Sequence, residues 1–398
     1  MELLSHPELR DRPVAVAGDE AARHGIVLAK NYIAKQYGVK TAEPLWQARQ
    51  KCPDIVFLPP HFELYEKYSR AVRRIYLDYT DMVESFGMDE CWLDVSGSRN
   101  LFGDGKSIAD SIRERVRGEL GLTVSVGVSF NKVFAKLGSD MKKTDATTVI
   151  DEKNFRELIW DLPASDLLFV GGKTDDKLRR FGIRTIGDLA RADRNLMKSF
   201  FGKNGVILHD FANGRDCSPV AFYGDSPPPK SIGNSTTAPR DLVNESDIEI
   251  VLYRLCESVS TRMREESVVC RTVQLYVRYR DLHSVERQLT LEHPNRTVRS
   301  LYESARRLIE KHGLAREPIR ALGVRACSLL RDAYEQLSFL PEIDKIQRAE
   351  LVESAVDALR KRYGSMAIRR GIMLTDDKLT AAAPDHLPMP APFTVSTY

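Results

Sequence analysis

Two adjacent carboxylates, Asp89 and Glu90, lie in the segment ESFGMDECWLDVSG (residues 84–97), with apolar residues before and after them. Neighbouring side chains of a regular strand point to opposite faces, so both can serve one site only at a turn or bulge, which Gly87 allows. Clustered carboxylates in an apolar setting need a positive partner. Mg²⁺ suits them because it takes hard oxygen ligands, often one or two carboxylates plus substrate phosphates. The alternative is that the pair caps a turn and stays in water.

Side chains that could bind phosphate occur at two further places. Tyr32 and Lys35 are three residues apart after an expected strand, a spacing that can put both on one helical face. Lys136 and Lys143 are seven apart, about two turns, and are expected on one face of a helix that follows another strand. Each pattern alone is more typical of a solvated lysine face or a core tyrosine. Together with the acidic pair, they favour a site for Mg²⁺ and a triphosphate.

The segment 170–190 reads as a helix, an FGI turn and a second helix. Gly171, Gly172 and Lys173 begin it, and Gly182 lies in the turn. A glycine hairpin of this kind can direct backbone N–H groups at a phosphate without reading bases. The alternative is a plain helix–turn–helix packing unit.

The elements that must position these residues belong to several domains, because 398 residues exceed one core. Residues 155–214 are expected to form short helices with glycine-containing turns. Apolar periodicity in the first 150 residues predicts strands over 13–17, near 25–32, twice within 81–96 and over 122–129, and helices over 43–51, 62–79, 108–120 and 131–143.

After the proline-rich linker 225–230, a third region shows clean alternation. Val273, Leu275 and Val277 face one way and their neighbours the other, which predicts a sheet with one buried face. The order of elements is βαββαβ, the split βαβ motif. It runs as strand 231–241, helix 246–265, strands 271–280 and 284–292, helix 297–312 and strand 319–329, followed by a helix over 344–362 and a disordered tail from 381.

Composition excludes some classes of protein. The six cysteines form no CxxC pair, so they are expected to be reduced thiols in a cytoplasmic protein and not a disulfide frame or zinc site. No apolar run is long enough to cross a bilayer, and no signal peptide is expected. The net charge of +3 decides little.

Five segments resemble, in the same order, motifs of the Y-family DNA polymerases of the DinB (DNA polymerase IV) type. The resemblance covers the chain to about residue 362. The segments are VAVAGD…RHGIVLAKNYIAKQYGVKTAEPLWQAR, ESFGMDECWLDVSG, VSVGVSFNKVFAKLGSDMKK, VGGKTDDKLRRFGIRTIGDLA and KSIGNSTTAPRDL.

The resemblance implies an α+β multidomain fold shaped as a right hand. It implies error-prone, low-processivity lesion bypass (translesion synthesis) in DNA repair, by template-directed nucleotidyl transfer to a primer 3′-OH. Primer–template DNA and deoxynucleoside triphosphates are the implied partners, and the protein is expected to be a monomer. The implied parts are fingers with a residual N-terminal palm (1–60), palm with the carboxylates (61–150), helix-hairpin-helix thumb (151–217), linker (218–231), little finger (232–340), and helical extension with a proline-rich tail (341–398).

The family pattern also assigns roles. Asp89 is a metal ligand, and Glu90 is the second carboxylate, which ligates metal and supports attack; two Mg²⁺ ions are the implied cofactor. Tyr32, Lys35 and Lys143 would hold the triphosphate. The implied DNA-binding residues are Gly171, Gly172, Lys173, Gly182 and Lys230.

The segment QLSFL (336–340) resembles the short peptide by which bacterial polymerases dock on the sliding clamp. Gln336 and the apolar anchors Leu337, Phe339 and Leu340 suit a groove, although the last two residues are permuted from the usual Leu-Phe. The alternative is an apolar turn that ends a domain.

The sequence departs from the family at its start. Relatives begin with a strand that carries an Asp and then an aromatic pair, which supply a third metal-binding carboxylate and a steric gate against ribonucleotides. MELLSHPELR looks like the helix after that strand, so about 15–20 residues are expected to be missing, metal affinity is expected to fall, and a palm edge is expected to be exposed.

Three hypotheses follow: an active lesion-bypass polymerase whose start lies upstream, a non-catalytic DNA- and clamp-binding protein, and a cyclase-like palm enzyme. The hairpin and little-finger motifs argue against the third, and the otherwise intact motifs favour the first.

Overall fold

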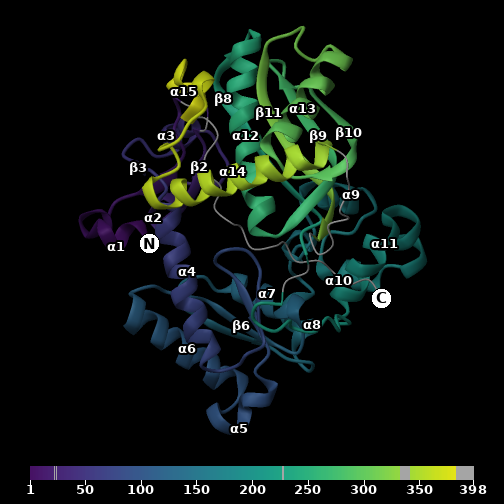
Figure 1. The fold of residues 1–398 in the computed structure, drawn as a ribbon. Coiled ribbons are helices and arrows are strands. Elements are labelled where there is room, and N and C mark those ends of the chain that lie inside the picture. The colour runs from purple at the N-terminus through teal and green to yellow at the C-terminus, as the bar shows by residue number, and fades with distance from the viewer. Residues whose placement is uncertain (22, 24, 226–227, 332–340, 382–398) are drawn as a thin grey trace.

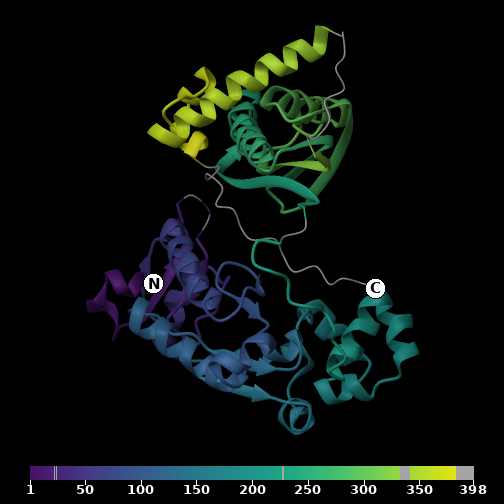
Figure 2. The ribbon, with the colours of Figure 1, turned by 60° about the horizontal axis from the view of Figure 1, so that its bottom comes forward.

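The structure of the protein, a computed structural model, describes residues 1–21, 23, 25–225, 228–331 and 341–381. Four units follow one another along the chain (Figure 1). Turned by 60°, the last unit stands over the first two, and the third lies to one side (Figure 2). We call them the N-terminal unit (1–60), the central unit (61–150), the helical unit (151–217) and the C-terminal unit (231–331 with 341–381).

The N-terminal unit is built on a three-stranded sheet in the order β2-β1-β3. Strand β1 runs antiparallel to β2 and parallel to β3. Asn31 caps α2, because its side chain accepts a hydrogen bond from the N–H of Ala34. The elements are α1 (Glu2–Ser5), η1 (Pro7–Leu9), β1 (Val14–Ala17), β2 (Val27–Lys30), α2 (Tyr32–Gln36), α3 (Leu45–Lys51) and β3 (Val56–Leu58).

The central unit carries its strands in two separate pairs: β4 with β5, antiparallel, and β6 with β7, parallel. No ladder joins the two pairs among the residues that the structure describes. Helices α4 and α6 share an apolar core that includes Ile75, Ile108 and Val116. The elements are α4 (Phe62–Leu77), β4 (Val83–Ser85), β5 (Cys91–Leu93), η2 (Ser96–Ser98), α5 (Arg99–Phe102), α6 (Gly105–Leu120), β6 (Val126–Ser129), α7 (Lys132–Met141) and β7 (Thr147–Ile150).

Helix α7 lies close against β6 because each carries a glycine where they meet. A Cβ on Gly127 would lie 1.9 Å from the carbonyl oxygen of Ala135, and a Cβ on Gly138 would lie 3.2 Å from Gly127 Cα. Backbone contact leaves little freedom to the helix. The position of Lys136, which follows Ala135, is therefore fixed relative to the strands.

The helical unit shares its core with α7. Val133 and Phe134 of α7 pack in one buried cluster with Phe155 and Ile159, so the chain crosses residue 150 without a break in the core. The elements are α8 (Phe155–Ile159), η3 (Ala164–Asp166), α9 (Gly172–Arg180), α10 (Ile186–Arg191) and α11 (Arg194–Ala212), the last of which is kinked at Gly202.

The C-terminal unit confirms the predicted βαββαβ order. Its sheet runs β10-β9-β11-β8, with β11 between the parallel strands β8 and β9, which is the split βαβ arrangement. The buried row Val273, Leu275 and Val277 confirms the predicted alternation. The elements are β8 (Ser231–Leu242), α12 (Glu245–Glu265), β9 (Val268–Tyr279), β10 (Ser284–Asn295), α13 (Val298–His312) and β11 (Ile319–Arg331).

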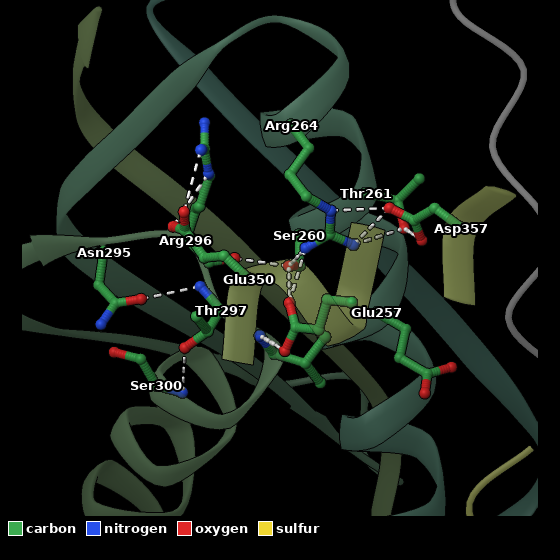
Figure 3. Close-up of polar contacts among 12 residues, drawn as sticks. Glu257, Ser260, Thr261, Arg264, Asn295, Arg296, Thr297, Ser300, Glu350 and Asp357 are labelled. Carbon is green, nitrogen blue, oxygen red and sulfur yellow. Dashed lines mark hydrogen bonds and ion pairs between the residues drawn. The ribbon is translucent and has the colours of Figure 1, made fainter. Parts of the chain in front are cut away.

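The segment after residue 340 belongs to the same unit. It contains α14 (Pro341–Tyr363), η4 (Gly371–Leu374) and α15 (Asp377–Ala381). Helix α14 crosses α12, where polar contacts join the two helices (Figure 3). Leu379 of α15 is fully buried in the core of the sheet domain, so this extension completes the unit.

Two of the predicted elements that are shorter than expected lie near the acidic hairpin. The strand predicted over 122–129 forms only as β6, because its partner β7 spans four residues and Leu122 and Val124 instead pack on the α4–α6 core. The helix predicted over 131–143 ends at Met141, so Lys143 is not on a helical face with Lys136.

All six cysteines are free thiols, as predicted. In the part of the chain that the structure describes, no helix is both long and apolar enough to cross a membrane.

Candidate functional site

Asp89 and Glu90 lie at the tip of the hairpin formed by β4 and β5. The N–H of Phe86 donates to the carbonyl of Glu90 at 2.8 Å and closes the turn. Gly87 has a φ of 88°, a conformation that side chains disfavour. The prediction that the acidic pair sits at a turn with Gly87 is therefore confirmed. Asp89 is exposed and Glu90 is half-buried.

Two side chains of helix α4 hydrogen-bond to the backbone of this turn. Ser69 donates its hydroxyl to the carbonyl of Met88, and Arg73 Nη2 donates to the carbonyl of Gly87 at 3.1 Å. Beneath the turn, burial raises the pKa of the Cys91 thiol, which keeps it neutral. The turn is thus fixed through its backbone, which leaves both carboxylates available.

A buried ion pair supports the hairpin from the side of α7. Lys132 Nζ lies 2.5 Å from Glu84 Oε2, and the lysine side chain is 5% exposed. Trp92 of β5 donates its indole N–H to the carbonyl of Lys132 at 2.9 Å. Glu84 also accepts from the N–H of Ala221 at 2.8 Å, so the segment that leads to the C-terminal unit is attached to β4.

The side chains of α7 reach the acidic pair. Lys136 Nζ lies 2.9 Å from Glu90 Oε1 and 2.7 Å from Asp140 Oδ2. The other oxygen of Asp140 lies 2.7 Å from Lys143 Nζ. The structure therefore joins Glu90, Lys136, Asp140 and Lys143 in one chain of opposite charges.

The pKa values reflect this chain. Burial lowers the pKa of Lys136, but its hydrogen bonds to Asp140 and Glu90 outweigh burial and raise the pKa overall. Burial raises the pKa of Asp140, but its bonds to Lys136 and Lys143 outweigh burial and lower it overall. Lys136 stays protonated and Asp140 ionised at neutral pH.

Tyr32 and Lys35 lie on α2, as predicted, and both are exposed. Tyr32 is 50% exposed. Neither side chain bonds to Asp89 or Glu90 within the described ranges. The two residues share the short helix α2, as the sequence predicts, but they do not contact the two carboxylates in the described chain.

The predicted helical hairpin is formed by α9 and α10. Gly171 is the N-cap of α9 and provides no side-chain cap, and Gly172 and Lys173 follow it, exposed. Gly182 has a φ of 76° in the turn between the helices. The N-terminus of α10 is closed by a capping box between Thr185 and Asp188, so only α9 presents uncapped N–H groups.

Lys230 is exposed directly before β8. The open face of the sheet presents Gln274, Tyr276 and Arg278 of β9, which alternate with the buried row. Gln336, Leu337, Phe339 and Leu340, predicted to bind a clamp, lie outside the described residues.

Comparisons with known proteins show which family the chain belongs to. A family model of the impB/mucB/samB family matches residues 1–140, and one for the C-terminal domain of that family matches residues 229–339. DNA polymerase IV of Acetivibrio thermocellus is 50% identical over 377 residues, which are 94% of this chain and 94% of that protein. DNA polymerase IV of Moorella thermoacetica is 39% identical and covers 93% and 92%.

The chain belongs to the impB/mucB/samB family. Solved structures of Y-family polymerases share its fold. A Y-family DNA polymerase chimera of Dbh and Dpo4 matches with a TM-score of 0.71 at 21% identity, over 83% of this chain and 95% of that chain. An insertion ternary complex of Dbh DNA polymerase matches with a TM-score of 0.59. The predicted right-hand architecture is therefore confirmed.

The acidic hairpin of this family member suits a hard divalent cation. Asp89 makes no hydrogen bond or ion pair within the described chain, and Glu90 binds a lysine that a metal ion can replace. Carboxylates in this number hold Mg²⁺ together with substrate phosphates. Across the ranges that the structure describes, no group of three or more His, Cys, Asp or Glu side chains is arranged to hold a metal.

Sequence reasoning missed three residues that the structure adds to the site: Arg73, Glu84 and Asp140. Asp140 is four residues after Lys136 and three before Lys143, a spacing typical of helical ion pairs, which was a usable signal. Arg73 and Glu84 contact residues far away in the sequence, and a local sequence pattern does not predict such contacts.

Proposed function

We propose that this protein is a template-directed DNA polymerase for translesion synthesis, and that Asp89 and Glu90 form its metal site. The observation that carries the proposal is the position of the two carboxylates at the tip of a hairpin, one of them exposed and the other held by a lysine. The N-terminal, central, helical and C-terminal units act as fingers, palm, thumb and little finger. The non-catalytic alternative is not favoured, because DNA polymerases match almost the whole chain.

Nucleotidyl transfer needs no covalent bond between the protein and the substrate. Bound Mg²⁺ would lower the pKa of the primer 3′-OH and stabilise the leaving pyrophosphate. Asp89 and Glu90 would hold the metal at this place, and Ser69 and Arg73 support their hairpin. Positioning and charge stabilisation then supply most of the rate enhancement.

The remaining phosphate contacts come from three units. Tyr32 and Lys35 of the fingers and Lys143 of the palm bind the triphosphate of the incoming nucleotide. Thumb residues Gly171 to Lys173 and the turn at Gly182 hold the duplex backbone. Lys230 and the open sheet face of the little finger lie along the DNA, and the protein acts as a cytoplasmic monomer.

A further contact is proposed for the segment 336–340. Its Gln and alternate apolar residues suit the groove of a sliding clamp. Binding there would keep a polymerase of low processivity at the primer end by raising its effective concentration.

Primer extension with Mg²⁺ and deoxynucleoside triphosphates tests the function. The double variant Asp89→Ala, Glu90→Ala is expected to extend a primer at least about 1,000-fold more slowly than the parent chain. Glu119→Gln is the matched control, because Glu119 is a paired carboxylate of the same unit on α6. Equal extension by the double variant and the parent chain would refute the assignment, and a chain that binds primer–template DNA without extending it would act by binding.

A further inference from the structure

Asp140 connects two parts of the proposed site that have different ligands. Its two oxygens bind different lysines, Lys136 at 2.7 Å and Lys143 at 2.7 Å. Lys136 also binds Glu90, the proposed metal ligand, whereas Lys143 is the proposed triphosphate ligand. One carboxylate therefore lies between the metal side and the nucleotide side of the active site.

The two lysines are held with different strength. The Lys136 side chain is 18% exposed, and it rises from the part of α7 that the Gly127–Gly138 contact fixes on β6. Lys143 is 51% exposed and lies beyond the end of the helix. Exposed ion pairs contribute little, so Lys143 can leave Asp140 easily. Among the described residues, Lys136 contacts two carboxylates at once, those of Glu90 and Asp140.

How strongly Lys136 binds Glu90 affects metal binding at that carboxylate. While Lys136 binds Glu90, its ammonium competes with a cation for the same carboxylate. An Asp140 that has given up Lys143 attracts Lys136 more strongly, because its charge is then shared with one lysine in place of two. Lys136 would then release Glu90.

We propose that Asp140 is a positioning residue that couples nucleotide binding to metal binding: Lys143 leaves it for the triphosphate, it then retains Lys136, and Glu90 becomes free for the metal. This inference rests on the proposed polymerase function, but it concerns an exchange of ion pairs and not the chemical step. Linked equilibria require the coupling to be reciprocal, so metal binding would also favour the release of Lys143.

The test measures metal binding directly. The full chain is mixed with a primer–template whose primer ends in a dideoxynucleotide, without nucleotide, and free Mn²⁺ is measured by electron paramagnetic resonance. Asp140→Asn is expected to weaken Mn²⁺ binding roughly five- to tenfold, a typical coupling between sites, because Lys136 then stays on Glu90. Asp140→Glu is expected to restore most of the affinity.

A double-variant cycle separates coupling from general loss of negative charge. In the Lys136→Ala background, Asp140→Asn is expected to change Mn²⁺ affinity less than about twofold, since the competing ammonium is gone. Lys143→Ala is expected to tighten Mn²⁺ binding in the parent chain more than in Asp140→Asn. Glu119→Gln, whose partner Arg115 also keeps a second acceptor in Asp78, is the control and is expected to leave Mn²⁺ binding unchanged.

Three results would overturn the proposal. The first is that Asp140→Asn changes Mn²⁺ affinity equally in the parent chain and in Lys136→Ala. The second is that Asp140→Asn leaves Mn²⁺ affinity unchanged while it unfolds at the same temperature as the parent chain. The third is that Mn²⁺ binding does not depend on Asp89 and Glu90. Because the dideoxy primer prevents turnover, the outcome is independent of primer extension, and failure of the polymerase proposal is recognised separately.

Discussion

Arg264 of α12 lies 2.6 Å from Glu353 of α14 and 2.6 Å from Asp357 of the same helix, and its side chain is 10% exposed (Figure 3). Glu353 also accepts hydrogen bonds from Ser260 and from the N–H of Val298. Burial raises the pKa of Glu353, which the arginine opposes. One guanidinium thus neutralises Glu353 and Asp357, while a third carboxylate of α14, Glu350, pairs with Arg296.

Removal of this arginine is expected to detach α14. Arg264→Ala leaves two largely buried carboxylates without their cation, which costs about 3 kcal/mol or more. The expected result is faster hydrogen exchange of the α12 and α14 amides and a lower unfolding midpoint of the little finger. Arg299→Ala is the control, because Arg299 is 81% exposed in its pair with Glu303 and its loss is expected to cost less than about 0.5 kcal/mol. Unchanged exchange in Arg264→Ala would mean that other contacts hold the extension, such as the ion pairs Arg296–Glu350 and Arg360–Glu257 and the burial of Leu379.

An ion pair joins the N-terminal and C-terminal units in the described part of the chain: Arg23 Nη1 lies 2.5 Å from Asp241 of β8. The hydrogen bond from Arg23 is the largest cause of the lowered pKa of Asp241. A carboxylate with a lowered pKa stabilises the contact when the pH is above its ordinary pKa, near 3.9. This stabilisation is lost as the pH falls through the lowered pKa. The contact is therefore expected to persist from neutral pH down to about pH 4 and then to break.

Asp241→Asn is expected to shorten the lifetime of this contact at pH 7 and to remove its response to acid. Energy transfer between one dye on the fingers and one on the little finger measures both effects. Glu292→Gln, an exposed change on the far edge strand β10, is the control. If the acid response survives in Asp241→Asn, another group controls the approach of the two domains.

Much of the fold could be predicted from the sequence because its signals are local. The alternation Val273, Leu275 and Val277 fixed the buried face of β9, and the proline-rich linker marked the start of the little finger. The order of strands in the sheet depends on which distant segments pair, and local periodicity gives no information about that pairing. The packing of α15 into the little-finger core was missed for the same reason, since Leu379 contacts residues far away in sequence.

The site divides in the same way. Gly87 beside two carboxylates predicted the hairpin tip, because a positive φ has a residue signature. The end of α7 before Lys143 was missed. Thr144 and Asp145 have φ values of 104° and 54°, and Arg113 holds Asp145 at 3.1 Å. Helix α7 therefore ends at Met141, and Lys143 is not on a helical face with Lys136.

The thumb hairpin offers a test by salt dependence. Lys173 is exposed in the first turn of α9, where the backbone N–H groups have no side-chain cap. If Lys173 contacts a phosphate, Lys173→Ala weakens binding to primer–template DNA of every sequence and reduces the slope of log K against log salt by about 1. Lys153→Ala, an exposed lysine of the same unit outside the hairpin, is expected to leave the slope unchanged. Titrations by fluorescence anisotropy at several salt concentrations measure the slopes, and equal slopes for Lys173→Ala and the parent chain would exclude the contact.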